Sequence, residues 1–322
     1  MINTKLAKTL KYWSMVMVIV TMVQGGAALF TISRGAETKP APQPENKPVV
    51  LGAMTDMRGE PVTKTKPKAP VKRVEPVTET ITAKSYLVYD DASKTVLLQK
   101  NASEKLSIAS LTKLMTAWVV YKYGNLNDYI TVSEKDIFNV SPVVGIKPGE
   151  EVKILDLFNA MLVGSANDAA LALANYTAEK TGKSFVSLMN EEAKSLNMQN
   201  SRFSNPLGFD SVNNYSTAND LMLLTEATQK LSAFTSLSKR TDYSFTSRQG
   251  DQHRVTATNK LIKAYNDVEA IKTGYTETAQ GSMMIAATNQ GHKVIVIVIG
   301  SQNREADSIT LKDAAFQAFS WQ

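Results

Sequence analysis

The sequence predicts an α+β fold built on an antiparallel sheet, and three observations support this prediction. Strand-like segments occur at both ends of residues 78–322, and strongly helical segments fill the middle of that region. Strands at the ends with helices between them are typical of a sheet that carries a helical insertion. The chain has 322 residues and 43% hydrophobic content, which is enough for a packed core.

The expected elements follow one another in a simple order. Two strands, KSYLVYD and KTVLLQK, are joined by the turn DASK, and a helical pattern then runs from Ser110 to about Tyr123. Helical patterns follow at residues 154–164, 168–180, 184–197 and 217–229. Strand patterns return at residues 242–247, 253–258, 268–274, 282–289 and 293–300, and a last helix runs from about Glu305 to Phe319.

The N-terminal residues look like a membrane-targeting segment. Residues 1–12 are basic, and residues 13–33 are mostly apolar over about the 20 residues that a bilayer-spanning helix needs. Lysines on the N-terminal side predict that this end stays cytoplasmic and that the rest of the chain is exported. We favour an uncleaved anchor, with a cleaved signal peptide as the alternative because small residues occupy positions 25–28. Either reading places the remaining chain outside the cytoplasm.

Residues 34–77 have the composition of a linker. Eight of the eleven prolines of the chain lie between residues 36 and 77, together with many charged residues. Such a segment cannot bury enough apolar surface to fold and is expected to be semi-extended. We therefore expect a basic N-terminus (1–12), a membrane segment (13–33), an extracytoplasmic linker (34–77) and one folded domain (78–322).

The charge distribution argues against a nucleic-acid partner. The chain carries +6 overall, but residues 1–33 contribute +3 and residues 34–77 contribute +4, which leaves −1 for residues 78–322. The absence of cysteine fits an exported chain without disulfides.

Ser110 and Lys113 are the first candidate catalytic residues. On a helix, residues three apart share a face, so both side chains would point into the same space. A serine hydroxyl becomes a good nucleophile when a neighbour takes its proton, and a lysine with a lowered pKa can do this. His253 and His292 are the only histidines and no G-x-S-x-G elbow precedes them, so a Ser-His-Asp triad is unsupported.

Two further motifs indicate which class of serine enzyme this pair could belong to. Penicillin-recognising serine enzymes combine S-x-x-K with a downstream S-x-N and a later K-T-G. Here Ser110-Leu-Thr-Lys113 is followed by Ser165-Ala-Asn167 and by Lys272-Thr273-Gly274, in the required order.

Other copies of these short motifs occur, and their contexts differ. Lys180-Thr-Gly182 closes a helical pattern, where the glycine suits a helix C-cap, whereas Lys272 follows a strand-like segment. Only a strand can lay extended backbone beside a substrate peptide. The S-x-N at Ser195 lies within a helix, whereas Ser165 is expected at a turn between two helices. Other copies begin at Ser211 (S-x-N) and Ser236 (S-x-x-K), the latter without the rest of the set.

With the motifs placed, residues 80–322 closely resemble the D-alanyl-D-alanine carboxypeptidases, the low-molecular-mass penicillin-binding proteins. Blocks such as IASLTKLMTA, MLVGSANDAALALA, AIKTGYTETA and NREADS stand in family order. The resemblance implies the transpeptidase fold shared by penicillin-binding proteins and β-lactamases, with an antiparallel sheet flanked by helices and a helical subdomain. It also implies a serine hydrolase that acts on peptidoglycan stem peptides and is acylated by β-lactams.

The resemblance implies a role for each motif residue on the nucleophile side. Ser110 would attack the carbonyl of the D-Ala-D-Ala bond, with Lys113 as base. Ser165 would relay a proton to the departing D-alanine. Asn167 would hold Lys113 and the substrate amide in place.

On the K-T-G side, Lys272 and Thr273 would bind the terminal carboxylate of the substrate, with Arg304 as a further partner. The backbone N–H groups of Ser110 and Tyr275 would form the oxyanion hole. We expect Gly274 to keep the strand open to the substrate, because a side chain there would obstruct its approach. We interpret two other polar residues of family-like blocks as structural: Asp168 as a helix cap and Asn205 as a loop hydrogen-bonder.

Three departures from the family pattern are visible. Gln280 separates Ala279 from Gly281, where relatives often have Ala-Gly. The chain stops just past its last predicted catalytic-domain helix, where many relatives add a β-rich domain and an amphipathic helix. The N-terminal segment would replace that membrane anchor, which is why we favour its retention.

Three alternatives to a carboxypeptidase were weighed. A class A β-lactamase is disfavoured, because its E-x-x-L-N segment is approached only by Glu192 to Asn197, one residue too long and inside a helical pattern. A D,D-endopeptidase that cuts peptidoglycan cross-links uses the same residues and stays open. A non-catalytic wall-binding homologue is the third reading.

No metal or organic cofactor is expected, because no H-E-x-x-H, paired-cysteine or phosphate-loop motif occurs.

Overall fold

A computed structural model of the chain describes residues 67–137 and 141–322. Within these ranges, no helix combines the length and the apolar character that crossing a bilayer requires. The expected basic N-terminus, the membrane segment at 13–33 and most of the linker lie outside the described residues.

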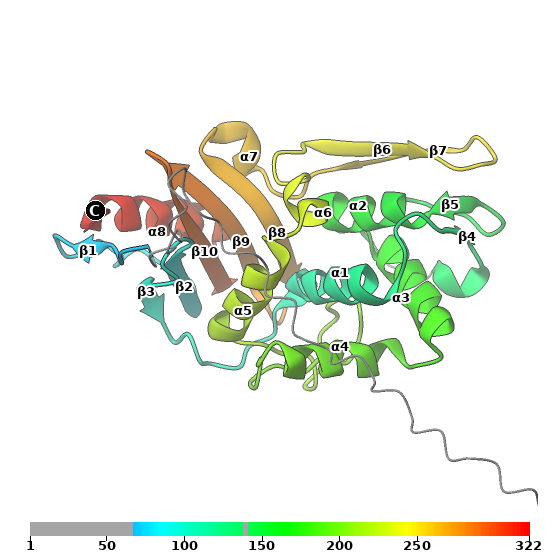
Figure 1. Cartoon of the computed structure of the whole chain (residues 1–322), viewed down its shortest axis with the longest axis horizontal. Helices are drawn as coiled ribbons and strands as arrows, with labels where there is room; N and C mark the ends of the chain where they lie inside the picture. Colours follow the sequence, from blue (N-terminus) through cyan, green and yellow to red (C-terminus); the bar gives the residue numbers. More distant parts are fainter. Residues whose placement is uncertain (1–66, 138–140) are drawn as a thin grey trace, which may run out of the picture. The chain divides into compact units, whose positions relative to one another are not determined.

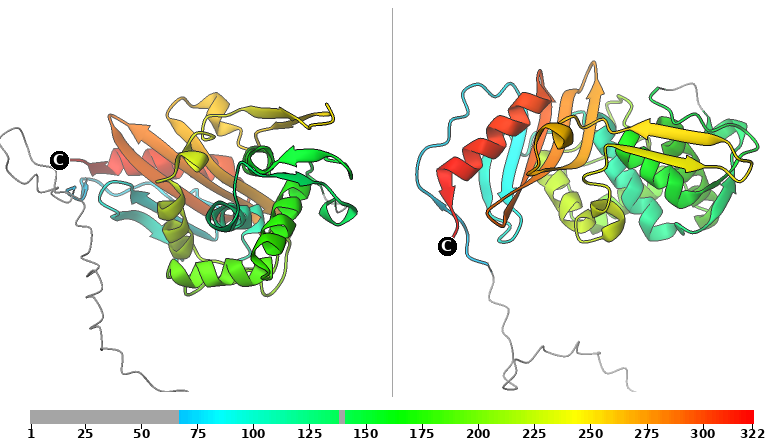
Figure 2. Two further views of the ribbon diagram at one scale, coloured as in Figure 1. Left: turned by 45° about the vertical axis from the view of Figure 1, so that its right-hand side comes forward. Right: turned by 90° about the horizontal axis from the view of Figure 1, so that it is seen from above.

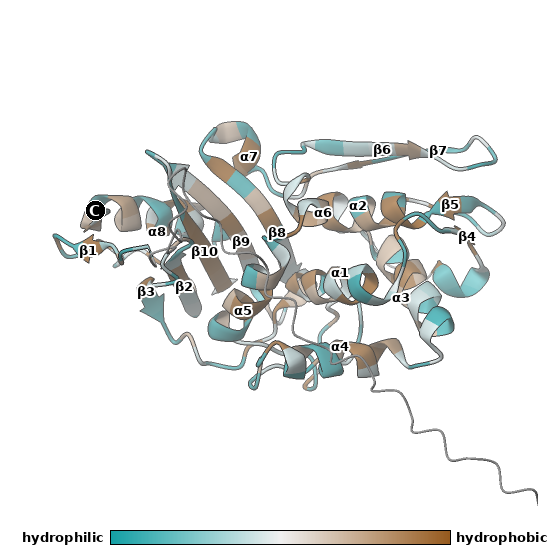
Figure 3. Ribbon diagram, viewed as in Figure 1, coloured by the Kyte–Doolittle hydropathy of each residue, from teal (hydrophilic) through white to brown (hydrophobic). Residues whose placement is uncertain are grey.

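A five-stranded antiparallel sheet forms one half of the fold (Figure 1). Its strand order is β3-β2-β10-β9-β8, so β8 lies at an edge, and every neighbouring pair is antiparallel. The strands are β2 (Ser85–Asp90), β3 (Val96–Lys100), β8 (Val268–Thr276), β9 (Gln280–Asn289) and β10 (His292–Ser301). The apolar runs of β9 and β10 are almost completely buried, as expected for strands that are covered on both faces (Figure 3).

Helices cover both faces of this sheet (Figure 2). Helix α8 (Arg304–Ala318) packs on one face and closes a smaller core with residues such as Val296 and Leu311. On the other face lie α1 (Thr112–Tyr123) and α5 (Ala218–Thr228). The observed sheet with its flanking helices confirms the α+β prediction.

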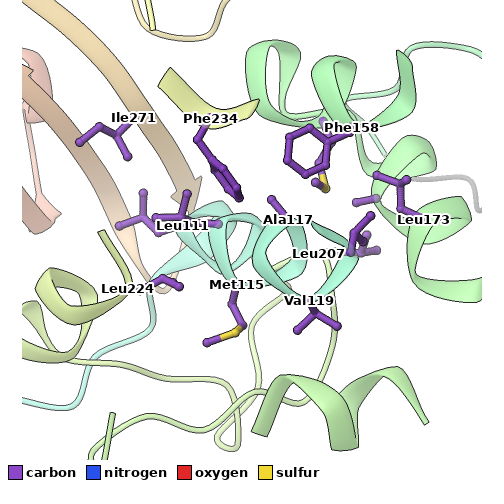
Figure 4. Packing of buried hydrophobic residues seen from close by; sticks show 14 of the residues in the cluster. Leu111, Met115, Ala117, Val119, Phe158, Leu173, Leu207, Leu224, Phe234 and Ile271 are labelled. Carbon is purple, nitrogen blue, oxygen red and sulfur yellow. The ribbon is translucent and has the colours of Figure 1, made fainter. Parts of the chain in front are cut away.

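The helical half surrounds α1, which is buried on nearly all sides. Its neighbours are α2 (Ile154–Gly164), α3 (Asn167–Thr181) and α4 (Phe185–Ser195). Met115 of α1 lies in the larger core together with residues such as Phe158 and Leu207 (Figure 4). The starts and ends of these helices lie within two residues of the sequence-based expectation.

Several short elements complete the described residues. They are the strands β1 (Val71–Lys72), β4 (Tyr129–Thr131), β5 (Glu151–Lys153), β6 (Asp242–Thr246), β7 (Gln252–Thr256) and β11 (Phe319–Ser320), the 3-10 turns η1 (Ala109–Leu111) and η2 (Glu134–Asp136), and the helices α6 (Ser232–Thr235) and α7 (Leu261–Ala264). Of these, only β6, β7 and the helical turn at Ser110 were expected. The others are too short to show a hydrophobic period.

Strand β1 lies inside the segment that we expected to be linker. It pairs with β11, with Val71 opposite Ser320, and the Arg73 side chain donates a 2.7 Å hydrogen bond from Nε to Ser320 Oγ. The ordered fold therefore includes residues from before position 78, because the C-terminal end offers them a strand edge.

Candidate active site

Ser110 lies on the tight turn η1 that leads into α1. The preceding residue, Ala109, has a φ of 47°, which is a left-handed conformation that L-residues rarely adopt. This turn directs Ser110 Oγ toward the amine of Lys113, and the two atoms are 3.1 Å apart. The expectation that the two side chains share a space is confirmed.

Lys113 is fully buried, with 0% of its surface exposed. Its Nζ also donates a 2.5 Å hydrogen bond to the Leu207 carbonyl oxygen. Burial, followed by the positive charge of Lys272, holds the pKa of Lys113 well below its usual range. A neutral amine next to a serine hydroxyl can accept the hydroxyl proton.

Ser165 occupies the junction between α2 and α3, as expected. It caps α2 in a left-handed conformation with φ 58°, and its hydroxyl accepts a 2.9 Å hydrogen bond from Lys272 Nζ. Lys272 Nζ also donates to its neighbour's carbonyl oxygen, Thr273 O, at 3.0 Å. Burial and the charge of Arg304 lower the pKa of Lys272 to about 7.

Asn167 has a different partner from the one we expected. Its side-chain Nδ2 donates to Ser141 O at 2.9 Å, and its backbone N–H donates to Pro142 O at 2.7 Å. These two bonds hold Asn167 against the loop before α2, whereas Lys113 binds Ser110 and Leu207. The buried Oδ1 of Asn167 has no hydrogen-bond partner within the described part of the chain.

Strand β8 carries the K-T-G residues past the nucleophile turn. A bulge lies between Ala270 and Lys272. Beyond it Lys272 and Thr273 pair regularly with Met284 and Met283, and both are buried. Tyr275, further along β8, is 59% exposed. Since β8 is an edge strand of the described sheet, extended backbone of a substrate can lie beside it.

Gly274 has a packing role that we did not expect, and its predicted role in keeping the strand open to substrate stays a prediction. A Cβ atom built there would lie 2.9 Å from Ser110 N and 3.0 Å from the Ala109 Cβ. The missing side chain therefore lets β8 pack directly against the nucleophile turn. The Gly274 carbonyl oxygen accepts a 2.7 Å hydrogen bond from Arg304 Nη1, which places this guanidinium at the same end of the site.

Two contributors to the site were missed by sequence reasoning. Leu207 acts through its backbone oxygen, so its side chain gives no chemical signal. Thr258 places its Oγ1 2.5 Å from Thr273 Oγ1, and the two threonines line, with Lys272, a cavity between α2, α6 and β8. A lone threonine carries no motif.

The structure explains the residues that we set aside. Gly182 caps α3 with φ 67°, so the second K-T-G is a helix end. Glu192 is buried and accepts hydrogen bonds from Trp118, Lys122 and Tyr123, which gives it a structural role in α4.

The structural interpretation of the other two polar residues needs one correction. Asp168 is not a cap in the usual sense, because Ala166 precedes the helix and the Asp168 carboxylate instead accepts N–H groups from residues 144–146. Asn205 is a loop hydrogen-bonder, as expected.

Comparison with known proteins gives a consistent result. The profile of the D-alanyl-D-alanine carboxypeptidase family matches residues 70–303. D-alanyl-D-alanine carboxypeptidase DacC of Escherichia coli is 34% identical over 236 residues, which cover 69% of this chain and 57% of DacC. DacF of Bacillus subtilis is 28% identical over 245 residues, which cover 74% of this chain and 63% of DacF. The chain thus spans about six-tenths of the length of these curated relatives.

Solved structures agree with this result. The DD-transpeptidase of Streptomyces K15 has a TM-score of 0.69 at 28% identity, over 76% of this chain and 100% of the other. A penicillin-binding protein homologue from Mycobacterium tuberculosis has a TM-score of 0.68 at 25% identity, over 78% of this chain and 96% of the other.

Proposed function

The chain belongs to the D-alanyl-D-alanine carboxypeptidase family, and on that premise we propose that it removes the terminal D-alanine from peptidoglycan stem pentapeptides. The reaction would proceed through an acyl-enzyme on Ser110. The observation that carries the proposal is the Ser110–Lys113 pair, a hydroxyl 3.1 Å from a fully buried amine with a lowered pKa.

In the first step, Ser110 Oγ attacks the carbonyl carbon of the D-Ala-D-Ala bond while its proton moves to Lys113 Nζ. The carbonyl electron pair moves onto oxygen, and we assign the backbone N–H groups of Ser110 and Tyr275 to that oxyanion. Gly274 supports this arrangement, because it allows the strand to approach Ser110 N closely.

In the second step, the C–N bond breaks and the departing D-alanine amine needs a proton. We assign the relay to the Ser165 hydroxyl, which accepts a hydrogen bond from Lys272. Ser165 would give its proton to the amine and receive in exchange the proton that Lys113 took from Ser110. Water then attacks the ester carbonyl and gives a proton to neutral Lys113. The bond between the carbonyl carbon and Ser110 Oγ breaks, Lys113 returns the proton to Ser110, and the shortened peptide leaves with a new carboxyl group.

Substrate binding would use the strand side of the site. We assign the terminal carboxylate of the substrate to Lys272 and Thr273, with Arg304 close by through its bond to Gly274 O. We assign an amide N–H of the stem peptide to Asn167 Oδ1, which has no hydrogen-bond partner among residues 67–137 and 141–322.

We also propose the surroundings in which this activity takes place. The family works on the cell wall, so we place the catalytic domain on the outer side of the cytoplasmic membrane. Residues 13–33 would be the anchor, or a signal that is removed. β-Lactams would acylate Ser110 because they present a strained amide in place of the D-Ala-D-Ala bond.

The test is mass spectrometry of a D-Ala-D-Ala-terminated pentapeptide incubated with the purified full-length chain, with Ser110→Ala as the control. We expect loss of one alanine with the wild-type chain and none with the variant. No loss with either protein would overturn the carboxypeptidase proposal.

Two other substrates make the result specific. Faster cleavage of a cross-linked muropeptide dimer than of the pentapeptide would favour the endopeptidase reading. Since one solved relative is a DD-transpeptidase, an added acceptor amine would reveal transfer of the acyl group in place of hydrolysis. A chain that binds cell wall but is not labelled by penicillin would be a wall-binding homologue.

A further inference from the structure

Residues 205–210, Asn-Pro-Leu-Gly-Phe-Asp, form a loop that lies against the nucleophile turn and that none of the three motifs includes. We call it the 205–210 loop. Two of its carbonyl oxygens accept hydrogen bonds from α1 side chains: Leu207 O from Lys113 Nζ at 2.5 Å, and Pro206 O from Thr116 Oγ1 at 2.7 Å. The loop therefore holds the predicted base from outside its own helix.

The loop also packs against the backbone beside the nucleophile. Gly208 has φ +88°, and a Cβ atom built there would lie 2.1 Å from Ala109 O and 2.9 Å from Ser110 N. No side chain fits into this contact. With Gly274 on its other side, the Ser110 turn lies between two glycine backbones, so its position depends on the loop as well as on β8.

One side chain determines the shape of the loop. Asn205 Oδ1 accepts hydrogen bonds from the backbone N–H groups of Leu207, Gly208 and Phe209, at 3.1, 2.8 and 3.0 Å. Its Nδ2 donates to Phe209 O at 3.0 Å. Because the Leu207 side chain is buried in the core, its carbonyl oxygen has a fixed direction once Asn205 has closed the turn (Figure 4).

A second side chain fastens the loop across the site. Asp210 Oδ1 accepts hydrogen bonds from Ser107 Oγ at 2.8 Å and from Thr276 Oγ1 at 2.9 Å. Ser107 lies three residues before Ser110, and Thr276 lies one residue after Tyr275. One carboxylate oxygen thus joins the two segments whose N–H groups we assign to the oxyanion.

We propose that Asn205 and Asp210 are positioning residues for acylation, Asn205 by aiming the Leu207 carbonyl oxygen at Lys113 and Asp210 by holding the Ser110 turn against β8. This inference rests on the proposed function. A neutral amine that donates one N–H to Leu207 O has its rotation fixed, so its lone pair can face Ser110 Oγ. Misplacement of a catalytic group by about 1 Å can cost about 10²-fold in rate.

The experiment measures acylation of the full-length chain by benzylpenicillin, separating the acylation rate constant from the affinity of the initial complex. Asn205→Leu removes the acceptor oxygen and is expected to lower the rate constant about 10²-fold, whereas Asn205→Asp keeps an acceptor and stays within about threefold. Asp210→Ala is expected to lower it about tenfold, and Asp210→Asn, which keeps an oxygen, to restore it to within about threefold.

Two matched controls lie next to these positions. Asn213→Leu changes an exposed asparagine of the same segment, and Glu277→Ala removes an exposed carboxylate just past Thr276. Both should acylate like the wild type. Equal losses in the apolar and the conservative variants, or losses that appear only in the affinity of the initial complex, would overturn the inference.

The remaining outcomes are also decisive. If Asn205→Leu fails to fold, the comparison of Asp210→Ala with Asp210→Asn tests the inference, because Asp210 is exposed and its replacement should leave the core intact. A wild-type chain that penicillin acylates but that releases no D-alanine overturns only the carboxypeptidase proposal. A wild-type chain that is not acylated overturns both proposals.

Discussion

The two sides of the site hold their residues by different means. On the helical side, Ser110 and Ser165 lie at helix junctions, where Ala109 and Ser165 have left-handed backbones with φ 47° and 58°. On the strand side, Lys272, Thr273 and Gly274 are consecutive residues of β8, placed by their register with β9 and by one bulge. Left-handed residues persist only where the surrounding structure holds them. The helical side should therefore be the more sensitive to changes in its packing.

Lys113→Met should have the largest effect, because it removes the base from the helical side while filling a similar buried volume. A positioned general base contributes about 10²–10⁴-fold, and we expect a loss of acylation rate of that size. The rate of Ser110 labelling by a penicillin, followed by mass spectrometry, checks this. A loss below tenfold would mean that another group takes the Ser110 proton.

Gly274→Ala tests the contact between the two sides. The new Cβ would lie 2.9 Å from Ser110 N, so either the strand or the turn must move, and we expect acylation to slow about 10²-fold. Gly291→Ala is the control, because a Cβ atom there meets nothing within 4 Å among the described residues, although Gly291, unlike Gly274, has a positive φ of 82°. It should cost about 1 kcal/mol of unfolding free energy, seen in thermal melts, and leave the rate unchanged. Equal rates for the two variants would show that the close packing is unimportant.

Thr258→Val tests the strand side alone. The loss of its hydroxyl leaves Thr273 Oγ1 without its 2.5 Å partner, so the Thr273 hydroxyl is less well aimed at a substrate carboxylate. We expect about a tenfold rise in KM for a peptide with a free terminal carboxylate, a small change in kcat, and recovery in Thr258→Ser. If Thr258→Ser is as impaired as Thr258→Val, the hydroxyl is not what matters.

The pH dependence of kcat/KM compares the two buried lysines directly. Lys113 must be neutral to act as base, so activity should fall as pH drops through its lowered pKa. Lys272 must be charged to bind a carboxylate, so activity should also fall as pH rises through about 7. The pH profile is therefore expected to be bell-shaped, with the acid limb set by Lys113 and the alkaline limb by Lys272.

Arg304→Gln should produce a shift of the alkaline limb, the smallest of the expected effects. The Arg304 charge is one cause of the lowered pKa of Lys272. Its removal should raise that pKa and move the alkaline limb to higher pH, while Arg304→Lys, which keeps the charge, should leave the limb in place. If the alkaline limb does not move in Arg304→Gln, that limb reports the titration of a group other than Lys272.

The sequence predicted the candidate catalytic residues, but their contacts became visible only in the fold. Periodicity located helices such as α2 and α3 because their length gives a clear pattern, whereas β4 and β5 have three residues each and depend on a partner strand about 20 residues away. The motifs pointed to Ser110, Ser165 and Lys272 because side-chain chemistry is visible in a sequence. Leu207 was missed since its backbone oxygen looks like that of any other residue. The contact of Gly274 with the nucleophile turn was not predicted, because η1 and β8 are far apart in the sequence and meet only in the folded chain.

The pairing of β1 with β11 has a mechanical consequence. Any pull on the chain ahead of residue 67 enters the fold through a ladder of two residue pairs and the bond from Arg73 N to Ala318 O. Under tension these few hydrogen bonds would break before the force reached β2 and the five-stranded sheet. The released residues would then lengthen the connection to the preceding chain. A domain attached in this way can therefore move a short distance when its N-terminal chain is pulled, while the Ser110 turn and β8 keep their geometry.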